Sequence, residues 1–287
     1  MRTLIGAVLL SIAATAAPAG QASAVTTGRW EKTYAITNRA TLSVLTDDGD
    51  VRVETWDRRS IGVRVNTHGW RIGERGVRVS ATQVGDRVAL DVRTPRWEFN
   101  FGVVIRSLQI EVWVPREADL ALETGDGDVS VPAVSGRLSV RTGDGGIAVD
   151  GAQGDLHVRS GDGRIIGTRL DGTLDAHTGD GGLHIDGRFD GLTLSSGDGG
   201  IVAEALPGSR LKSEWSVSTG DGRVTLRVPT DLKADLEAHT GDGALDIDLP
   251  VTISGRVSRH DVRGTMNGGG PLLRLRTGDG SIRVEGR

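Results

Sequence analysis

The chain has 287 residues, of which 37% are hydrophobic and 3% aromatic, with 43 glycines and no cysteine. The lack of cysteine excludes disulfides, a thiolate nucleophile and a cysteine-based zinc or iron–sulfur site. The net charge of −4 gives no basic field, so nucleic acid is not an expected partner. Because aromatic residues are so few, the composition favours many small stacked units over one large conventional core.

The first residues have the three parts of a secretory signal peptide. Arg2 gives a positive start, residues 4–17 form an apolar run, and Ala22-Ser23-Ala24 supplies the small side chains of a cleavage site. We therefore predict a signal peptide at residues 1–24 and export, either to the periplasm or to the extracellular space and cell surface. The apolar run is shorter than the roughly 20 residues that a spanning helix needs, so no membrane span is expected.

Residues 25–118 are predicted to form a less regular N-terminal β region. Strand-like stretches occur over residues 62–66, 77–82, 87–92 and 108–114. We expect this region to form longer coils that cover the first edge of the repeats, because a bare parallel edge invites aggregation. Trp97, Phe99 and Phe101 alternate on one strand face and are expected to cap that end, with a sugar-stacking platform as the alternative.

Residues 119–287 carry a repeated motif, [Thr/Ser]-Gly-Asp-Gly. Its aspartates are Asp126, Asp144, Asp162, Asp180, Asp198, Asp221, Asp242 and Asp279. The first four intervals are all 18 residues and the later ones are 23, 21 and 37, while residues 46–50 hold a degenerate early copy. Such regular recurrence is typical of a repeat architecture.

The residues around each aspartate alternate with the period of a strand. Around Asp144 the apolar residues are Leu138, Val140, Ile147 and Val149. Each repeat is therefore predicted to be a strand, a tight Gly-Asp-Gly turn and a second strand, stacked on the next repeat about 4.8 Å away. The predicted fold class is all-β, a parallel β-solenoid of about 18-residue coils that is right-handed. Hairpins between the turn-linked strands are the alternative.

The turns and the far end of the chain give three finer expectations. The glycines on both sides of each aspartate should adopt positive φ angles, which suit a sharp turn. The Thr or Ser should point inward and cap turn N–H groups. The last strand, ending at Arg287, should leave an exposed edge through which the protein could associate with itself or with another protein.

The sequence resembles the bacterial putative-adhesin β-strand-repeat family, an exported domain of unknown function. The resemblance rests on Val112-Trp113-Val114-Pro115 leading into residues 120–131, on the successive Gly-Asp-Gly turns, and on Asn267-Gly268-Gly269-Gly270-Pro271 followed by residues 273–284. It covers most of the mature chain, from about residue 30 to residue 287. The resemblance implies an exported β-repeat protein with no catalytic residues to carry over.

The eight aspartates form the sharpest candidate site, with two interpretations. In register, their carboxylates would lie about 5 Å apart and repel by roughly 1 kcal/mol in water. Either each carboxylate accepts N–H groups of its own turn and is solvated, or a ladder of Ca²⁺ ions lies between the turns. No other cofactor is expected.

Other polar residues are candidates for binding rather than catalysis. Arg141 and Arg159, together with Arg276, share an outward column that could recognise anionic sugar groups or be a solvated face. Trp56 and Trp113 fall outside the inward rows and are candidates for exposed contacts. Four of the six histidines are expected on outward positions of the repeats; they are His157, His177, His184 and His239.

The sequence contains no nucleophile elbow, zinc-protease pair or phosphate loop followed by a helix. The leading prediction is therefore an exported non-enzymatic protein that binds or scaffolds at the cell envelope, with polysaccharide or protein as partner. The alternatives are a carbohydrate-active β-helix enzyme, which needs converging carboxylates, and a purely structural self-assembling module.

Overall fold

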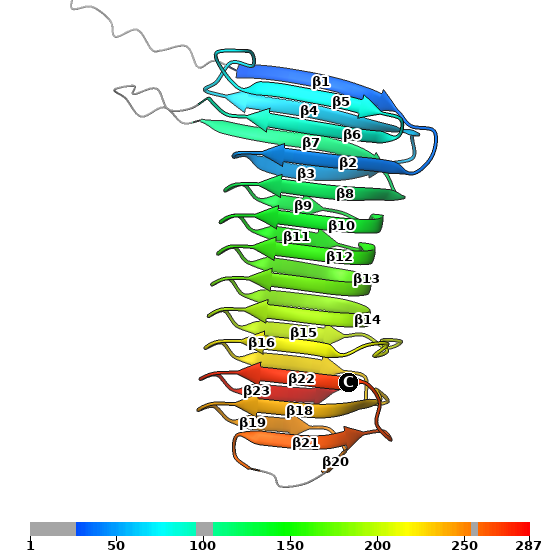
Figure 1. Cartoon of the computed structure of the whole chain (residues 1–287), viewed down its shortest axis with the longest axis vertical. Helices are drawn as coiled ribbons and strands as arrows, with labels where there is room; N and C mark the ends of the chain where they lie inside the picture. Colours follow the sequence, from blue (N-terminus) through cyan, green and yellow to red (C-terminus); the bar gives the residue numbers. More distant parts are fainter. Residues whose placement is uncertain (1–26, 96–105, 254–257) are drawn as a thin grey trace, which may run out of the picture.

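A computed structural model describes residues 27–95, 106–253 and 258–287. Over these ranges the protein is all-β, as predicted, and its 23 strands join into one sheet that forms a tall, solenoid-like stack (Figure 1). The predicted signal peptide at 1–24 and the predicted cap of Trp97, Phe99 and Phe101 lie outside the described residues. Within those ranges, no helix has the length and apolar character needed to cross a bilayer.

The strands form two layers, and each Gly-Asp-Gly turn connects one layer to the other. The spatial order of layer A is β5 (Arg78–Val84), β6 (Arg87–Arg93), β2 (Ala40–Thr46), β8 (Ala118–Thr124), β10 (Ser135–Thr142), β12 (Gln153–Ser160), the second parts of β13 (Ile165–Thr178) and β14 (Leu183–Ser196), β16 (Trp215–Thr219), β22 (Leu272–Thr277), β18 (Ala234–Thr240), β21 (Asp261–Met266) and β20 (Val251–Ile253). Layer A thus contains the strands that lead into the turns, with β5 and β6 added at one end and β21 and β20 at the other. The order of layer B is β1 (Thr27–Ala35), β4 (Ser60–His68), β7 (Ser107–Pro115), β3 (Asp50–Trp56), β9 (Val129–Val131), β11 (Ile147–Asp150), the first parts of β13 and β14, β15 (Ile201–Ala205), β17 (Val224–Val228), β23 (Ile282–Gly286) and β19 (Leu245–Asp248). Layer B thus contains the strands that leave the turns, with β1, β4 and β7 added at one end.

In the repeats, equivalent strands pair in parallel. Val140 in β10 lies opposite Leu122 in β8 and Val158 in β12, so the register follows the 18-residue period. Both layers bury every second residue, and these rows form one hydrophobic core. Each fully buried Val, Leu or Ile stabilises the stack by about 1.5–3 kcal/mol relative to an exposed one. The hairpin alternative is wrong for the repeats, because β10 and its turn-linked partner β11 pair with other coils.

Antiparallel strands close both ends, so the sheet is mixed and the prediction of a uniformly parallel stack is wrong there. At one end β5 pairs antiparallel with β6, and β4 pairs antiparallel with both β7 and β1. At the other end β21 pairs antiparallel with β18 and β20. An antiparallel strand can reverse direction through a short turn, whereas another parallel strand requires a full coil of chain.

Among the described coils, neither the first, made of β2 and β3, nor the last, made of β22 and β23, lies at an end of the stack. β2 lies between β6 and β8, and β22 lies between β16 and β18 (Figure 1). The prediction that the last strand leaves an exposed edge is therefore wrong, because β23 pairs with β17 on one side and β19 on the other. In the described part of the chain, β19 is the outermost strand of layer B at that end.

The predicted role of the turn hydroxyl is confirmed. The buried Thr142 hydroxyl accepts the N–H of Gly145 at 3.2 Å and lies 3.1 Å from the carbonyl of Gly127 in the preceding turn, to which it donates. Ser160 repeats both contacts one coil later, at 2.9 Å each. Each hydroxyl thus satisfies its own turn and connects that turn to its neighbour.

The predicted positive φ angles are wrong for the glycines that flank the eight repeat aspartates. Positive φ occurs instead at the second bend, for example at Gly154 with φ 122°. The turn glycines are needed for close approach, since a Cβ on Gly163 would overlap the carbonyl of Gly145 in the adjacent turn. The stacking distance, and not the local backbone angle, demands glycine at this position.

Candidate functional site

The eight repeat aspartates lie on exposed turns down one edge of the stack. The N–H of Asp162 bonds to the carbonyl of Gly143 in the preceding turn, so the turn backbone is already paired between coils. In the early copy, the Asp48 carboxylate accepts the N–H of Gly49 at 2.6 Å, as the solvated-turn interpretation expects. Across the described ranges, no group of three or more His, Asp or Glu side chains is arranged to hold a metal. The calcium ladder stays a prediction.

The arginine candidates lie on the outer face of layer A. Arg141 is opposite Arg159, and Arg159 is opposite His177, which places them in one column as the period predicts. In the adjacent column, Asp175 lies 3.6 Å from Arg159 and 3.5 Å from His157, and it also pairs with His177. This acidic side chain partly neutralises the column, which weakens it as a site for anions.

The other two of these four histidines, His239 and His184, face outward as predicted and are exposed. His239 is in the same column as Arg276, and its ring contacts Asp261 in β21 at 2.7 Å. This contact lowers the pKa of Asp261 below its ordinary value. His184 is exposed on layer B.

Trp56 and Trp113 lie on layer B and are therefore separate from Arg141 and Arg159. Trp56 ends β3 and Trp113 is in the adjacent strand β7, so their rings meet on the outer face with centroids 6.3 Å apart. Gly62 of β4 lies opposite Trp113, and a Cβ at this glycine would meet the Trp56 ring at 2.7 Å. The absence of a side chain at Gly62 makes room for the indole pair.

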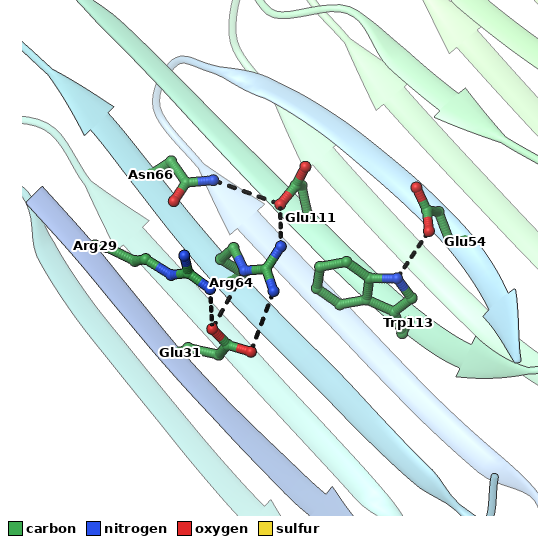
Figure 2. A network of polar contacts seen from close by, with 7 residues as sticks. All are labelled: Arg29, Glu31, Glu54, Arg64, Asn66, Glu111 and Trp113. Atoms are coloured by element: carbon green, nitrogen blue, oxygen red, sulfur yellow. Dashed lines mark hydrogen bonds and ion pairs between the residues drawn. The ribbon is translucent and has the colours of Figure 1, made fainter.

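A network of ion pairs continues from the indole pair across layer B (Figure 2). Arg64 contacts Glu31 at 3.3 Å and Glu111 at 3.1 Å, and its guanidinium lies 4.7 Å from the centre of the Trp113 ring. Trp113 Nε1 donates to Glu54 at 2.8 Å. The hydrogen bond from Arg64, together with one from Arg29, lowers the pKa of Glu31. These side chains fix Trp113, and through it Trp56.

A pocket of about 530 Å³ opens beside Trp56 where three connections meet. Residues 37–39 join β1 to β2, residues 56–59 join β3 to β4, and residues 115–117 join β7 to β8. The lining holds four arginines and two carboxylates, so it is positively charged. Its carboxylates belong to Asp57 and Glu117, both exposed, and Asp57 lies 3.6 Å from Arg116. This chemistry favours binding of an anion.

The connection that forms one wall of the pocket is anchored by Asp86. Its carboxylate accepts the backbone N–H of Thr37 at 2.7 Å and that of Asn38 at 3.1 Å. The hydrogen bond from Thr37, with further bonds from Asn38, lowers the pKa of Asp86. The wall is therefore fixed by a carboxylate that is far away in sequence.

Sequence reasoning identified Trp56 but missed the arginines around it. Arg39, Arg58 and Arg116 lie in three connections that are far apart along the chain, and none belongs to a motif or to a strand row. Their only sequence signal was the run Trp56-Asp57-Arg58-Arg59, which places two basic residues next to an outward aromatic one.

One of the similar solved structures supports the fold. A protein named putative lipid binding protein from Parabacteroides distasonis has a TM-score of 0.50 at 15% identity, over 90% of this chain and 96% of that one. Two others are named putative adhesins: one from P. distasonis (TM-score 0.46, 9% identity, 89% and 96% coverage) and one from Bacteroides fragilis (0.43, 10%, 89% and 96%). At such identities the likeness concerns fold alone. No curated protein matches this sequence.

The family model of Toastrack DUF4097 matches residues 40–285, which is most of the chain. The match runs from β2, the early Gly-Asp repeat, through the last strand β23. It confirms the predicted resemblance to a β-strand-repeat domain of unknown function. This protein therefore belongs to the Toastrack DUF4097 family.

Proposed function

We propose that this protein is an exported, non-enzymatic, adhesin-like protein that binds or scaffolds at the cell envelope. In this proposal residues 1–24 are removed as a signal peptide, and residues 25–118 cap a right-handed β-solenoid formed by residues 119–287. The stack presents a long, rigid surface, and repeat proteins of this kind use such surfaces for binding.

The pocket beside Trp56 is the observation that carries the proposal. It combines an aromatic side chain with arginines in a concave site, which suits recognition of a polar polymer. Glycoside hydrolysis requires two carboxyl groups at a set separation, one of them with a raised pKa. Here Asp57 is 91% exposed and lies 3.6 Å from Arg116, so this carboxylate is a solvent-exposed partner of an arginine at the pocket.

Co-sedimentation of residues 25–287 with cell-wall and polysaccharide fractions tests the proposal. We expect saturable binding by the wild-type protein and clearly weaker binding by Trp56→Ala. Arg210→Ala removes an exposed arginine from the connection between β15 and β16, away from the candidate sites, and should bind like the wild type. If no fraction binds the wild-type protein, or if Trp56→Ala binds equally well, the proposal is wrong.

A further inference from the structure

We infer that the pocket beside Trp56 is an oxyanion site, in which Arg58 and Arg59 bind a carboxylate or phosphate group of an acidic envelope polymer. The inference deepens the proposed function, on which it rests, by naming the chemical class of the ligand. It is based on a difference among the four arginines of the pocket, since within the described part of the chain two of them form ion pairs and two do not.

Two of the four arginines are already neutralised. Arg39 lies 3.1 Å from Asp119 and donates to the carbonyl of Ser135 at 2.7 Å. Burial raises the pKa of Asp119, but the hydrogen bonds from the Arg137 N–H and from Arg39 outweigh it, and the pKa is lowered overall. Arg116 is matched by Asp57 at 3.6 Å. These two arginines therefore contribute to the wall of the pocket more than to its open charge.

Arg58 and Arg59 are exposed, and over the described ranges neither lies within 4 Å of a carboxylate oxygen. Three nearby carboxylates are occupied, since Asp57 faces Arg116, Asp119 faces Arg39, and Asp86 accepts N–H groups of residues 37–38. Glu117 also lines the pocket and is exposed. The guanidinium groups of these two consecutive residues, Arg58 and Arg59, which both line the pocket, thus keep their donors for a ligand.

Trp56 holds one of these groups in place. The Arg58 guanidinium lies 5.0 Å from the centre of the Trp56 ring, which itself packs against Trp113. Trp56 Nε1 donates to the carbonyl of Ser60 at 2.8 Å, so the ring is fixed at its polar end as well. A stacked guanidinium keeps its in-plane N–H groups free for a bidentate contact with an oxyanion, and its ordering lowers the entropy cost of binding.

The roles of the three residues therefore differ. Arg58 and Arg59 contact the anion, whereas Trp56 is a positioning residue that acts through Arg58. A carboxylate and a phosphate both present oxygens to the two N–H groups of a guanidinium, so the structure indicates an oxyanion. Experiment must decide which of the two groups the ligand carries.

Calorimetric titration of residues 25–287 with three polymers tests the inference. The probes are polygalacturonate, which carries carboxylates, its fully methyl-esterified form, which has the same backbone without charge, and a glycerol phosphate oligomer. We expect binding to at least one anionic probe and none to the ester, with affinity falling as salt is raised. The anionic probe that binds more tightly identifies the source.

Substitutions assign the contacts. Arg58→Ala and Arg59→Ala should each weaken binding of the anionic probe about tenfold, equivalent to about 1.4 kcal/mol. Arg210→Ala, which removes the same charge far from the pocket, should leave binding unchanged. Trp56→Phe keeps an aromatic ring under Arg58 and should retain more affinity than Trp56→Ala. If only the charges of Arg58 and Arg59 mattered, the two Trp56 variants would bind equally well. Both arginines are exposed, so Arg58→Ala and Arg59→Ala should unfold at the same urea concentration as the wild type.

The failures of the two proposals are distinguishable. Equal binding of the methyl ester, or unchanged affinity in both arginine variants, would overturn the oxyanion site while leaving a binding function intact. If neither the probes nor the cell-wall fractions bind, both proposals fail.

Discussion

The turn glycines occupy positions at which this fold leaves no room for a side chain. The second glycine of each turn lies where a Cβ would overlap a carbonyl of the adjacent turn, as at Gly163. Gly163→Ala should therefore force two coils apart and destabilise the protein by about 1–3 kcal/mol. Gly146→Ala is the matched control, because its nearest neighbour would be an Asp128 oxygen at 3.4 Å, so its stability should change little. Urea unfolding midpoints compare them; equal midpoints would contradict the close-approach explanation.

The exposed aspartates give a second test at the level of one side chain. Neighbouring carboxylates about 5 Å apart repel weakly in water, so Asp162→Asn should be neutral or stabilise by at most about 0.5 kcal/mol. We also expect the melting temperature of the wild type to respond equally to calcium and to magnesium at matched ionic strength. A shift specific to calcium that is lost in Asp162→Asn would instead establish the ladder.

The placement of the last coil inside the stack changes what its residues contribute. Leu275 lies in β22, flanked by Val217 and Ala238, and is fully buried, although it is close to the end of the chain. Leu275→Ala should cost about 2–5 kcal/mol, as for any core leucine. Leu245→Ala makes the same change in β19, where the side chain is only partly buried and the strand has one partner, so it should cost less. Chemical denaturation measures both; a larger cost at Leu245 would contradict this order of coils.

For the whole molecule, acid should act first at the ends of the stack. The carboxylates whose pKa is lowered are Glu31, Asp86, Asp119 and Asp261, of which Glu31 and Asp86 lie at one end of the stack and Asp261 at the other. The hydrogen bonds described above cause these shifts, from Arg64 at Glu31, from Thr37 at Asp86 and from His239 at Asp261. At Asp119 burial raises the pKa, but the hydrogen bonds from Arg137 and Arg39 outweigh it. A carboxylate with a lowered folded pKa contributes stability that is present above its unfolded pKa of about 4 and is lost as pH falls through the folded value.

Hydrogen exchange at pH 7 and pH 3 measures this effect. We expect β1, β5 and β21 to lose protection at pH 3 before β10 and β12, whose turns are connected by hydroxyl and backbone bonds that do not titrate in this range. Asp86→Asn should reduce the difference between the two pH values near β5. Uniform loss of protection along the stack would contradict the prediction.

The repeats are the part of this protein that sequence could predict well. A period of 18 residues brings like residues together, so the inward rows, the turn hydroxyls and the outward column of Arg141 and Arg159 are fixed by local alternation alone. The close approach that demands glycine was not visible, because it depends on the distance between coils and not on the turn itself.

The order of the coils at the two ends required the three-dimensional structure. The inward row of β22 is equally able to stack on β16 or on β18, and nothing local indicates that it lies between them. The pocket beside Trp56 likewise could not be predicted from local sequence, since its walls come from connections separated by tens of residues along the chain. Periodic patterns specify which face of a strand is buried, but the choice among similar edges is a long-range one, made by the total burial and pairing of the finished stack.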